Sequence, residues 1–203
     1  VPKGYNGTEF SEIPLIVEKG ECGQNKDETV NGVRWMIDNK RNLVIYGEGN
    51  MNDFETPKTT GSNTKRELIS NQIIAPWFNR TKLFHYIKII GKVYKIGSYA
   101  FAYLEKVQTI TLNDALKTIN NFASESMSKV ETIGLKKGIE TLGLGIFKNC
   151  ANLTTITVTT DNMKYQSIEG VLYTKPESVI NKAITLIAYP MKKEGKSYTI
   201  ALI

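Results

Sequence analysis

Residues that could carry out catalysis are few and widely separated in this chain. The 203 residues include one histidine, His85, which lies in the segment LFHYIKI at the entrance of an expected strand. A histidine-based triad requires a nucleophile beside the imidazole, and the pattern around His85 provides none. We therefore interpret His85 as a structural or exposed residue.

The two cysteines, Cys22 and Cys150, are distant in sequence. Together with the single histidine they do not supply the four ligands of a structural zinc site. Cys150 occupies an expected core position, whereas Cys22, in GECGQN, is predicted to lie in an exposed turn. The spacing leaves open whether the two are paired.

Seven acidic residues considered as candidates occur singly, without the paired spacing of metal or glycosidase sites. They are Asp38, Asp53, Glu105, Asp114, Glu131, Glu140 and Asp161. Gly143 and Gly145 lack the third glycine of a dinucleotide fingerprint, and GEGN at 47–50 is predicted to be a turn. We expect no catalytic residues, no metal and no cofactor.

The net charge of +6 comes mainly from scattered lysines rather than from the Arg- and aromatic-containing patches typical of nucleic-acid binders. Hydrophobic content of 41% and charged content of 23% are ordinary for a globular protein. No apolar run approaches the length of a membrane span. We expect no nucleic-acid partner, no membrane insertion within these residues, and, because the chain starts at Val1, a longer parent chain.

The strongest signal is a repeat of 23 residues without gaps. Its apolar positions recur as Ile96, Ile119, Leu142; Leu104, Met127, Cys150; Val107, Val130, Leu153; Ile110, Ile133, Ile156; and Leu112, Leu135, Val158. Phe78, Phe84, Ile87, Ile89 and Val93 mark a degenerate earlier copy. Each unit ends in x-I-x-L, which alternates as a strand does. Before it, Tyr99 to Leu104 has the apolar spacing of one or two helical turns.

One such unit cannot bury its own apolar edge, but stacked units can. The fold class predicted is therefore α/β: a leucine-rich-repeat solenoid of 23-residue repeats, with a parallel strand ladder on its concave face. Residues 1–76 are expected to form a β-rich capping region with a polar surface loop at 55–70. Residues 77–203 are expected to form the solenoid, including a β-hairpin insertion at 163–190.

Each end of the solenoid has its own strand pattern. VRWMID and LVIYG predict an N-terminal hairpin that buries Trp35, Ile37, Leu43 and Ile45 against the end of the stack. GVLYTK and ITLIAYP predict the antiparallel pair of the C-terminal insertion, and SYTI at 197–200 is similar to the start of another repeat strand.

Outward strand positions between the buried ones form three columns on the expected concave face. They are Tyr86, Thr109, Thr132, Thr155; Lys88, Thr111, Gly134, Thr157; and Ile90, Asn113, Lys136, Thr159. Threonine favours exposed strands by propensity alone, so a plain β surface and a partner-binding face both remain open. Gly134 leaves a notch that could admit a side chain or a sugar.

Three Asn-x-Thr sequons, at Asn6, Asn79 and Asn152, are candidate N-glycosylation sites. They favour a secretory route only mildly.

The motifs GSYAF…L…V..I.L and IFKNCANLTTITV resemble the repeat units of the BspA-like, or Treponema pallidum type, leucine-rich-repeat family. WMIDNKRNLVIYGEGNM followed by APWF, and YQSIEGVLYTK…LIAYP, resemble the family's N-terminal segment and hairpin insertion. Ser124 and Met127 depart from the usual phenylalanine and cysteine.

The resemblance implies a secreted or cell-surface adhesion protein that binds host cells, matrix proteins or other microbes through a protein or glycoprotein ligand. The alternatives are a structural spacer in a larger surface protein, an enzyme such as a glycan hydrolase, and a cytosolic interaction scaffold. The expected function is non-enzymatic adhesion or recognition.

Overall fold

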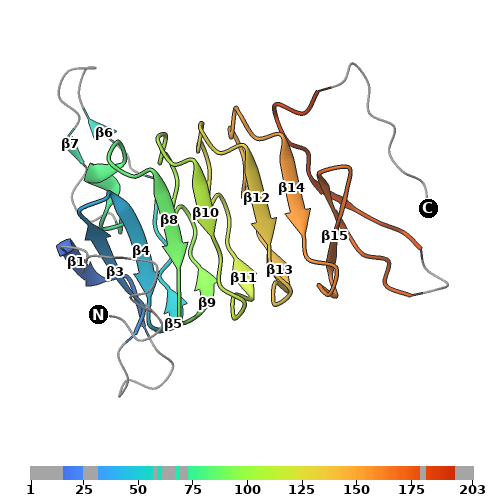
Figure 1. Cartoon of the computed structure of the whole chain (residues 1–203), viewed down its shortest axis with the longest axis horizontal. Coiled ribbons are helices and arrows are strands. Elements are labelled where there is room, and N and C mark those ends of the chain that lie inside the picture. Colours follow the sequence, from blue (N-terminus) through green and yellow to red (C-terminus); the bar gives the residue numbers. More distant parts are fainter. Residues whose placement is uncertain are drawn as a thin grey trace.

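The computed structural model describes residues 16–24, 32–56, 59–60, 67–68, 73–178 and 182–194. In this part of the chain the elements are β-strands and one short 3₁₀ helix, η1 (Phe78–Arg80). Figure 1 shows the strands in a row along the long axis, from the N-terminal hairpin at one end to the C-terminal strands at the other.

The front row is built from strands that follow one another in parallel. β8 (Tyr86–Ile89) pairs with β10 (Thr109–Thr111), and β12 (Thr132–Leu135) pairs with β14 (Thr155–Val158). Thr132 lies opposite Thr155, an offset of 23 residues along the chain. The parallel ladder expected from the repeat is therefore present.

A second parallel ladder lies behind the first and was not predicted (Figure 1). It joins β5 (Glu48–Met51), β9 (Lys92–Ile96), β11 (Thr118–Ile119) and β13 (Thr141–Leu142), with β2 (Gly23–Gln24) antiparallel at its N-terminal edge. Thr118 lies opposite both Lys95 and Thr141, again with an offset of 23 residues. The segment GEGN, predicted as a turn, supplies most of β5, because its backbone pairs with β9.

The segments expected to form helical turns are not helical, so the α/β assignment is wrong for the described residues. Their backbone N–H groups donate hydrogen bonds to the next 23-residue turn of the solenoid, which we call a coil. Phe101 donates to the carbonyl of Ala123 at 2.7 Å, and Ser124 donates to that of Ile146 at 3.1 Å. An α-helix would need those donors for its own carbonyls. Left-handed φ angles recur at two positions of each coil: Tyr99, Phe122 and Gly145, and then Tyr103, Ser126 and Asn149.

The repeated apolar positions form a continuous core between the two ladders. Leu104, Met127 and Cys150 are fully buried, as are Val107 and Val130. Ile110, Leu142 and Val158 are partly buried at its edges. A coil therefore buries its apolar edge only against its neighbours, as a solenoid requires.

The N-terminal hairpin joins the front ladder directly. β3 (Arg34–Asp38) and β4 (Asn42–Tyr46) are antiparallel, β4 runs parallel to β8, and β1 (Ile16–Glu21) adds an unpredicted strand beside β3. The expected inward residues Trp35, Ile37, Leu43 and Ile45 are buried in the common core.

Trp77 is the aromatic centre of this end of the stack. Its ring stacks on Phe101, with centroids 6.1 Å apart, and meets Trp35 and Phe54 edge-on at 5.9 Å. Its indole N–H donates to the carbonyl of Ala100 at 2.8 Å. Trp77, rather than the half-buried Phe78 expected from the repeat, thus fills the core position before Phe101.

The C-terminal insertion contains the predicted antiparallel pair, β16 (Val171–Thr174) with β17 (Leu186–Ala188), and a third strand, β15 (Tyr165–Ile168). Ile156 of β14 donates to the carbonyl of Gly170, which connects the insertion to the stack. Within the loop at 55–70, the described residues beyond Thr56 form only a two-residue ladder, β6 (Thr59–Thr60) with β7 (Glu67–Leu68). SYTI lies outside the described residues, and the domain division stays a prediction.

Candidate partner-binding surface

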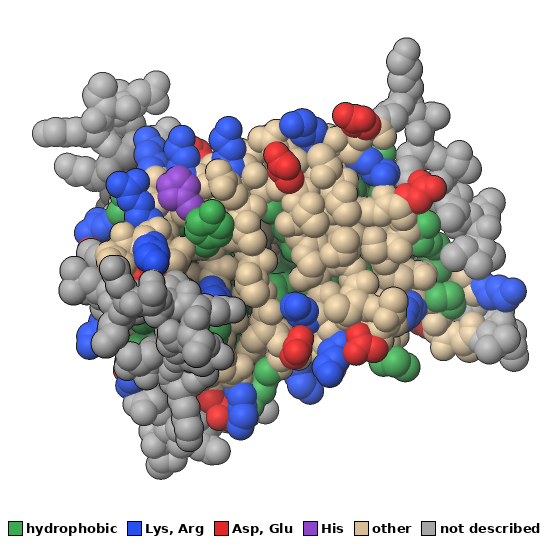
Figure 2. Space-filling view, viewed as in Figure 1, with side chains coloured by type: hydrophobic (Ala, Val, Ile, Leu, Met, Phe, Trp, Pro, Cys, Tyr) green, Lys and Arg blue, Asp and Glu red, His purple; other side chains and the backbone are tan. Residues whose placement is uncertain are grey.

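Front-ladder side chains that point away from the core form one surface, which we call the threonine face. It consists of Tyr86, Lys88, Ile90, Thr109, Thr111, Asn113, Thr132, Gly134, Lys136, Thr155, Thr157 and Thr159. In Figure 2 the centre of the view consists mainly of backbone and of side chains that are neither charged nor hydrophobic, and most charged side chains lie along its upper and lower margins. The assignment of this face to the concave side stays a prediction.

None of the twelve residues is buried. Tyr86 is 49% exposed, five threonines are exposed, and Thr155, Lys88, Ile90, Asn113, Gly134 and Lys136 are half-buried. The columns follow directly from the register, since Thr109 lies opposite Tyr86 and Gly134 lies opposite Thr157. Neighbouring residues of a column are therefore about 4.8 Å apart, and neighbouring columns about 6.7 Å apart.

Buried isoleucines fix this surface from behind. Ile87, Ile133 and Ile156 alternate with the outward residues, and each is at most 2% exposed. β10 and β12 lie side by side but belong to separate ladders, so the face consists of two hydrogen-bonded pairs of strands. A partner would meet a surface whose backbone is already ordered, which lowers the entropy cost of binding.

Two positions of the face have features that set them apart from the threonines. The amide of Asn113 donates to the carbonyls of Gly91 and Val93, so its side chain connects successive coils. At Gly134 an added Cβ would approach only the hydroxyl of Thr157, at 3.3 Å. The notch expected at Gly134 is therefore open to the surface.

The histidine and cysteine candidates lie on separate strands and loops of the described chain. His85 is half-buried just before β8. Within the described ranges, no three His, Cys, Asp or Glu side chains gather closely enough to hold a metal ion. No helix in the described part reaches the length and apolarity needed to cross a bilayer.

Both cysteines are free and buried. For Cys150 this matches the expected core position; burial raises its thiol pKa to about 11, and its Sγ donates to the carbonyl of Ser124 at 3.1 Å. For Cys22 the prediction of an exposed turn is wrong, because the residue is 1% exposed. Its backbone bonds to Val33 on one side and Asn52 on the other, which directs the thiol into the core, and burial there raises the pKa of the thiol.

A polar cluster around Asp53 was missed by the sequence interpretation, which treated this carboxylate as isolated. Its Oδ1 accepts hydrogen bonds from the backbone N–H and hydroxyl of Ser98 and from the amide of Asn120, at 2.6–3.0 Å. Its Oδ2 accepts from Lys95 Nζ at 2.8 Å. Partial burial alone would raise the pKa of Asp53, but these bonds outweigh it and hold the pKa well below its usual range. The cluster links the N-terminal region to the first coils.

The glycosylation candidates differ in accessibility. Asn79 is exposed within η1. The amide nitrogen of Asn152, to which a glycan would be attached, donates to the carbonyl of Ser128, and its oxygen accepts from Lys192 Nζ. Asn6 lies outside the described residues.

Comparison with known families identifies the repeat. A model described as "BspA type Leucine rich repeat region" matches residues 71–175, just over half of the chain, with six copies. The chain belongs to the BspA-type leucine-rich-repeat family. No curated protein matches its sequence.

Solved structures similar to this family member include a pneumococcal antigen and bacterial leucine-rich proteins. The pneumococcal vaccine antigen PcpA is 28% identical, with a TM-score of 0.51, over 57% of this chain and 27% of that one. The chain thus spans about a quarter of the antigen's length. A leucine-rich cell surface protein of Faecalibacterium prausnitzii is 16% identical, with a TM-score of 0.45, over 95% and 66% of the two chains. The leucine-rich-repeat protein of T. pallidum is 17% identical, with a TM-score of 0.33, over 66% and 70%.

Proposed function

We propose that this chain is a non-enzymatic adhesion or recognition module displayed at a cell surface or secreted. It binds host or microbial glycoproteins, or extracellular matrix proteins, through the threonine face. The observation that carries this proposal is an outward, largely uncharged surface built on hydrogen-bonded parallel strands with buried residues behind it. Membership of the BspA-type family supports it.

The size of the face limits how much of an interface it can provide. Four strands at about 4.8 Å and three columns at about 6.7 Å cover about 390 Å². A stable protein interface covers about 800 Å² on each partner. The threonine face therefore forms the centre of an interface, and the charged margins or the C-terminal strands β15–β17 provide the rest.

The chemistry of the face suits a glycoprotein or polar protein surface. Each threonine offers a hydroxyl donor and acceptor beside a methyl group, and the open position at Gly134 lets a protruding group approach the backbone. Lysines at the margins add attraction to acidic partners that weakens with salt.

The second candidate is a structural spacer that presents another part of a longer surface protein. It is favoured by the fact that the chain covers 27% of the pneumococcal antigen's chain. A spacer predicts that this chain alone binds neither cells nor matrix proteins.

The two candidates separate in a binding assay with the isolated chain on epithelial cells and immobilised matrix proteins. Saturable binding that disappears when the chain is unfolded supports the adhesion module. Absence of binding, with the fold intact by circular dichroism, favours the spacer. Glycan analysis at Asn79 in the native host tests the secretory route, and the exposed position of this residue makes it the preferred acceptor of the two described sequons.

A further inference from the structure

Cations that are scattered in the sequence gather at one end of the front ladder. Figure 2 shows the single histidine on the visible face, with Lys and Arg side chains beside and above it. We call this surface the basic corner, and it consists of Arg41, Lys82, His85 and Lys106. The backbone N–H of His85 donates to the carbonyl of Arg41 at 3.4 Å, and the carbonyl of His85 accepts from Gln108 at 2.9 Å. These three residues therefore precede β4, β8 and β10 side by side, with backbones about 4.8 Å apart.

Two lysines lie in the turns that lead into these strands. Lys82 is three residues before His85. Lys106 occupies the place of Leu83 one coil later, because β8 and β10 pair with an offset of 23 residues. Both lysines and Arg41 are exposed, and none of the three side chains pairs with an acidic residue of the described ranges. Three cations from separate segments of the chain thus reach the same end of the ladder without a partner there.

Arg41 is held by a rigid turn between β3 and β4. The buried carboxylate of Asp38 accepts from the backbone N–H groups of Lys40 and Asn42 and from the Asn42 amide, at 2.6–3.0 Å. The backbone N–H of Arg41 donates to the Asp38 carbonyl at 3.0 Å. Arg41 has φ +63°, a left-handed position at which glycine or asparagine is usual. An arginine there is unfavourable for the backbone, which indicates a role for its guanidinium.

Few acidic groups oppose these charges among the described residues. Glu18 is already paired with Arg80, at 2.7 Å, and Asp38 is buried behind the turn. Glu105, exposed beside Lys106, offsets one positive charge. The basic corner therefore carries more positive than negative charge, and it attracts anions.

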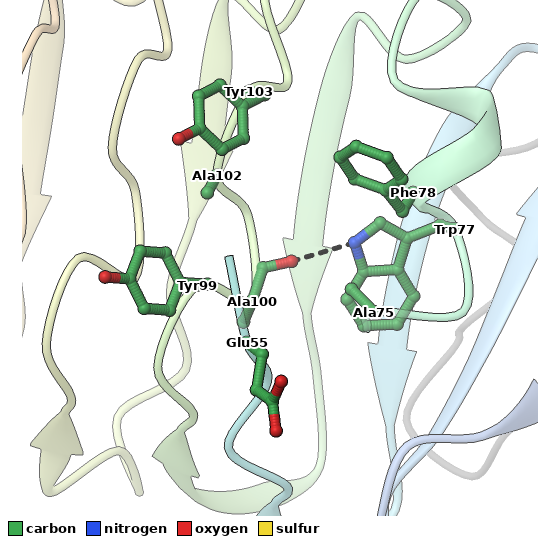
Figure 3. Close-up of a pocket in the computed structure, with 8 residues that line it drawn as sticks. All are labelled: Glu55, Ala75, Trp77, Phe78, Tyr99, Ala100, Ala102 and Tyr103. Atoms are coloured by element: carbon green, nitrogen blue, oxygen red, sulfur yellow. Dashed lines mark hydrogen bonds between the residues drawn. The ribbon is translucent and has the colours of Figure 1, made fainter. Parts of the chain in front are cut away.

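An exposed aromatic ring adjoins the cations. Tyr86 follows His85 and is 49% exposed, although its backbone pairs with strands on both sides. It offers a flat apolar face and a hydroxyl at a low entropy cost. By contrast, the hollow beside Trp77 and Tyr99 has room for about one water molecule (Figure 3). That hollow is too small for a sugar, whereas the surface around Tyr86 is open.

We propose that the basic corner binds an acidic glycan, with carboxylate or sulfate groups on Arg41, Lys82 and Lys106 and a sugar ring against Tyr86. The guanidinium binds such oxyanions in a bidentate manner, and cations on neighbouring coils suit a chain that carries charges at intervals. Single-stranded nucleic acids stack successive bases on several aromatic rings, whereas the threonine face has one aromatic residue. This inference rests on the proposed function and names the class of ligand.

The test measures binding of the purified chain to immobilised glycans of equal length, by biolayer interferometry at physiological salt. Heparin oligosaccharides carry sulfates and carboxylates, hyaluronan carries carboxylates alone, and dextran is the neutral control. We expect saturable binding of at least one acidic glycan, at least tenfold weaker binding of dextran, and a loss of affinity when the salt concentration is doubled. The comparison of heparin with hyaluronan shows which anionic group is recognised.

Two double variants with the same change of charge locate the site. Arg41→Gln with Lys82→Gln removes two cations of the basic corner. Lys137→Gln with Lys164→Gln removes two exposed lysines that lie beyond the C-terminal ends of β12 and β14. We expect at least fivefold weaker glycan binding for the first variant and less than a twofold change for the second, once equal Tm values have been established. Tyr86→Ala, which keeps the net charge, should weaken binding at least threefold.

Equal losses in the two double variants would overturn the proposal, because binding would then depend on net charge alone. Unchanged binding in Tyr86→Ala would contradict the contact with the sugar ring, and equally tight binding of single-stranded DNA would contradict the choice of ligand. A chain that adheres to cells or matrix proteins but binds neither acidic glycan would refute this inference and leave the proposed function intact. Glycan binding by a chain that adheres to nothing would support the basic corner while refuting the proposed function.

Discussion

Replacement of Asp53 by asparagine should destabilise the protein at neutral pH more than at acidic pH. Asp53 joins the segment after β5 to residues in the first two coils, through Lys95, Ser98 and Asn120. Asparagine keeps one acceptor oxygen for Ser98 and Asn120 but presents an uncharged amide to the ammonium of Lys95. The substitution therefore removes one ion pair and the charge that strengthens the other bonds.

The magnitude follows from the exposure of the cluster. A hydrogen bond to a charged group contributes about 1.5–3 kcal/mol when well sheltered. The side chain of Asp53 is 49% exposed and that of Lys95 is 25% exposed, so solvent screening reduces this value. We expect a loss of about 1–2 kcal/mol at pH 7, which lowers Tm by about 2–8 °C in a domain of this size.

The pH dependence follows from the lowered pKa of Asp53 in the folded state. A carboxylate with a depressed folded pKa stabilises the fold fully above its unfolded value, about pH 4. That stabilisation is lost as the pH falls toward the folded pKa. The difference in Tm between the wild type and Asp53→Asn should therefore be largest at pH 7 and shrink below pH 4.

Calorimetric scans of both proteins at pH 7, 4.5 and 3, in the same salt concentration, measure this difference. Asp114→Asn, at an exposed position, is the control and should change Tm by less than about 1–2 °C. Equal stability of Asp53→Asn and wild type at pH 7 would refute the reasoning, as would a difference that stays constant down to pH 3.

Further predictions concern the core, the turns and the cysteines. Leu104→Ala should cost about 2–5 kcal/mol in equilibrium unfolding because it opens a cavity between coils, whereas Leu144→Ala, 75% exposed, should stay within about 0.5 kcal/mol. Gly145→Ala should cost more than about 1 kcal/mol in the same assay, since Gly145 has φ +59° and an added Cβ would lie 2.5 Å from the Phe122 ring. Gly134→Ala is its milder control, because an added Cβ would meet only the side-chain hydroxyl of Thr157, at 3.3 Å, and Gly134 does not have a left-handed φ. The thiol of Cys150 should resist a thiol-specific reagent at pH 8 until the chain is unfolded, because burial raises its pKa to about 11; rapid labelling of the folded chain at that position would contradict its buried placement.

The core and the front ladder were predictable because the 23-residue period places residues such as Leu104 and Met127 in equivalent positions. Their burial depends only on apolar side chains that recur in register. The burial of the hairpin residues Trp35 and Ile45 was predictable from a second local signal, the period-two alternation of apolar and polar residues in a strand.

The turns could not be predicted correctly from that pattern. The apolar spacing from Tyr99 to Leu104 suits a helical turn, and it suits equally a set of stacked bends whose N–H groups bond to the next coil. Left-handed φ angles at Tyr99 and Tyr103 give no signal in residue type, because neither is glycine or asparagine. The second ladder was missed because Thr118–Ile119 and Thr141–Leu142 are too short to show alternation.

The candidate sites likewise divide into those that follow from a local sequence pattern and those that depend on long-range contacts. The threonine face follows from strand alternation, so its residues could be named from the sequence. The Asp53 cluster and the basic corner depend on contacts between residues that are far apart in the chain, such as Asp53 with Asn120 and Arg41 with His85. The burial of Cys22 likewise depends on Val33 and Asn52, which no local pattern places beside it.

The most direct test of the threonine face compares threonine-to-alanine substitutions on the two ladders. One protein carries Thr109→Ala, Thr111→Ala, Thr155→Ala and Thr157→Ala on the front ladder. The other carries Thr118→Ala and Thr141→Ala on the second ladder, where the strands are parallel in the same way. Binding of both to matrix proteins and epithelial cells is measured beside the wild type, after equal Tm values have been established. We predict that the affinity of the front-ladder variant is at least tenfold weaker than that of the wild type and that the affinity of the second-ladder variant is unchanged. Equal binding by all three proteins would contradict the assignment of partner binding to the threonine face.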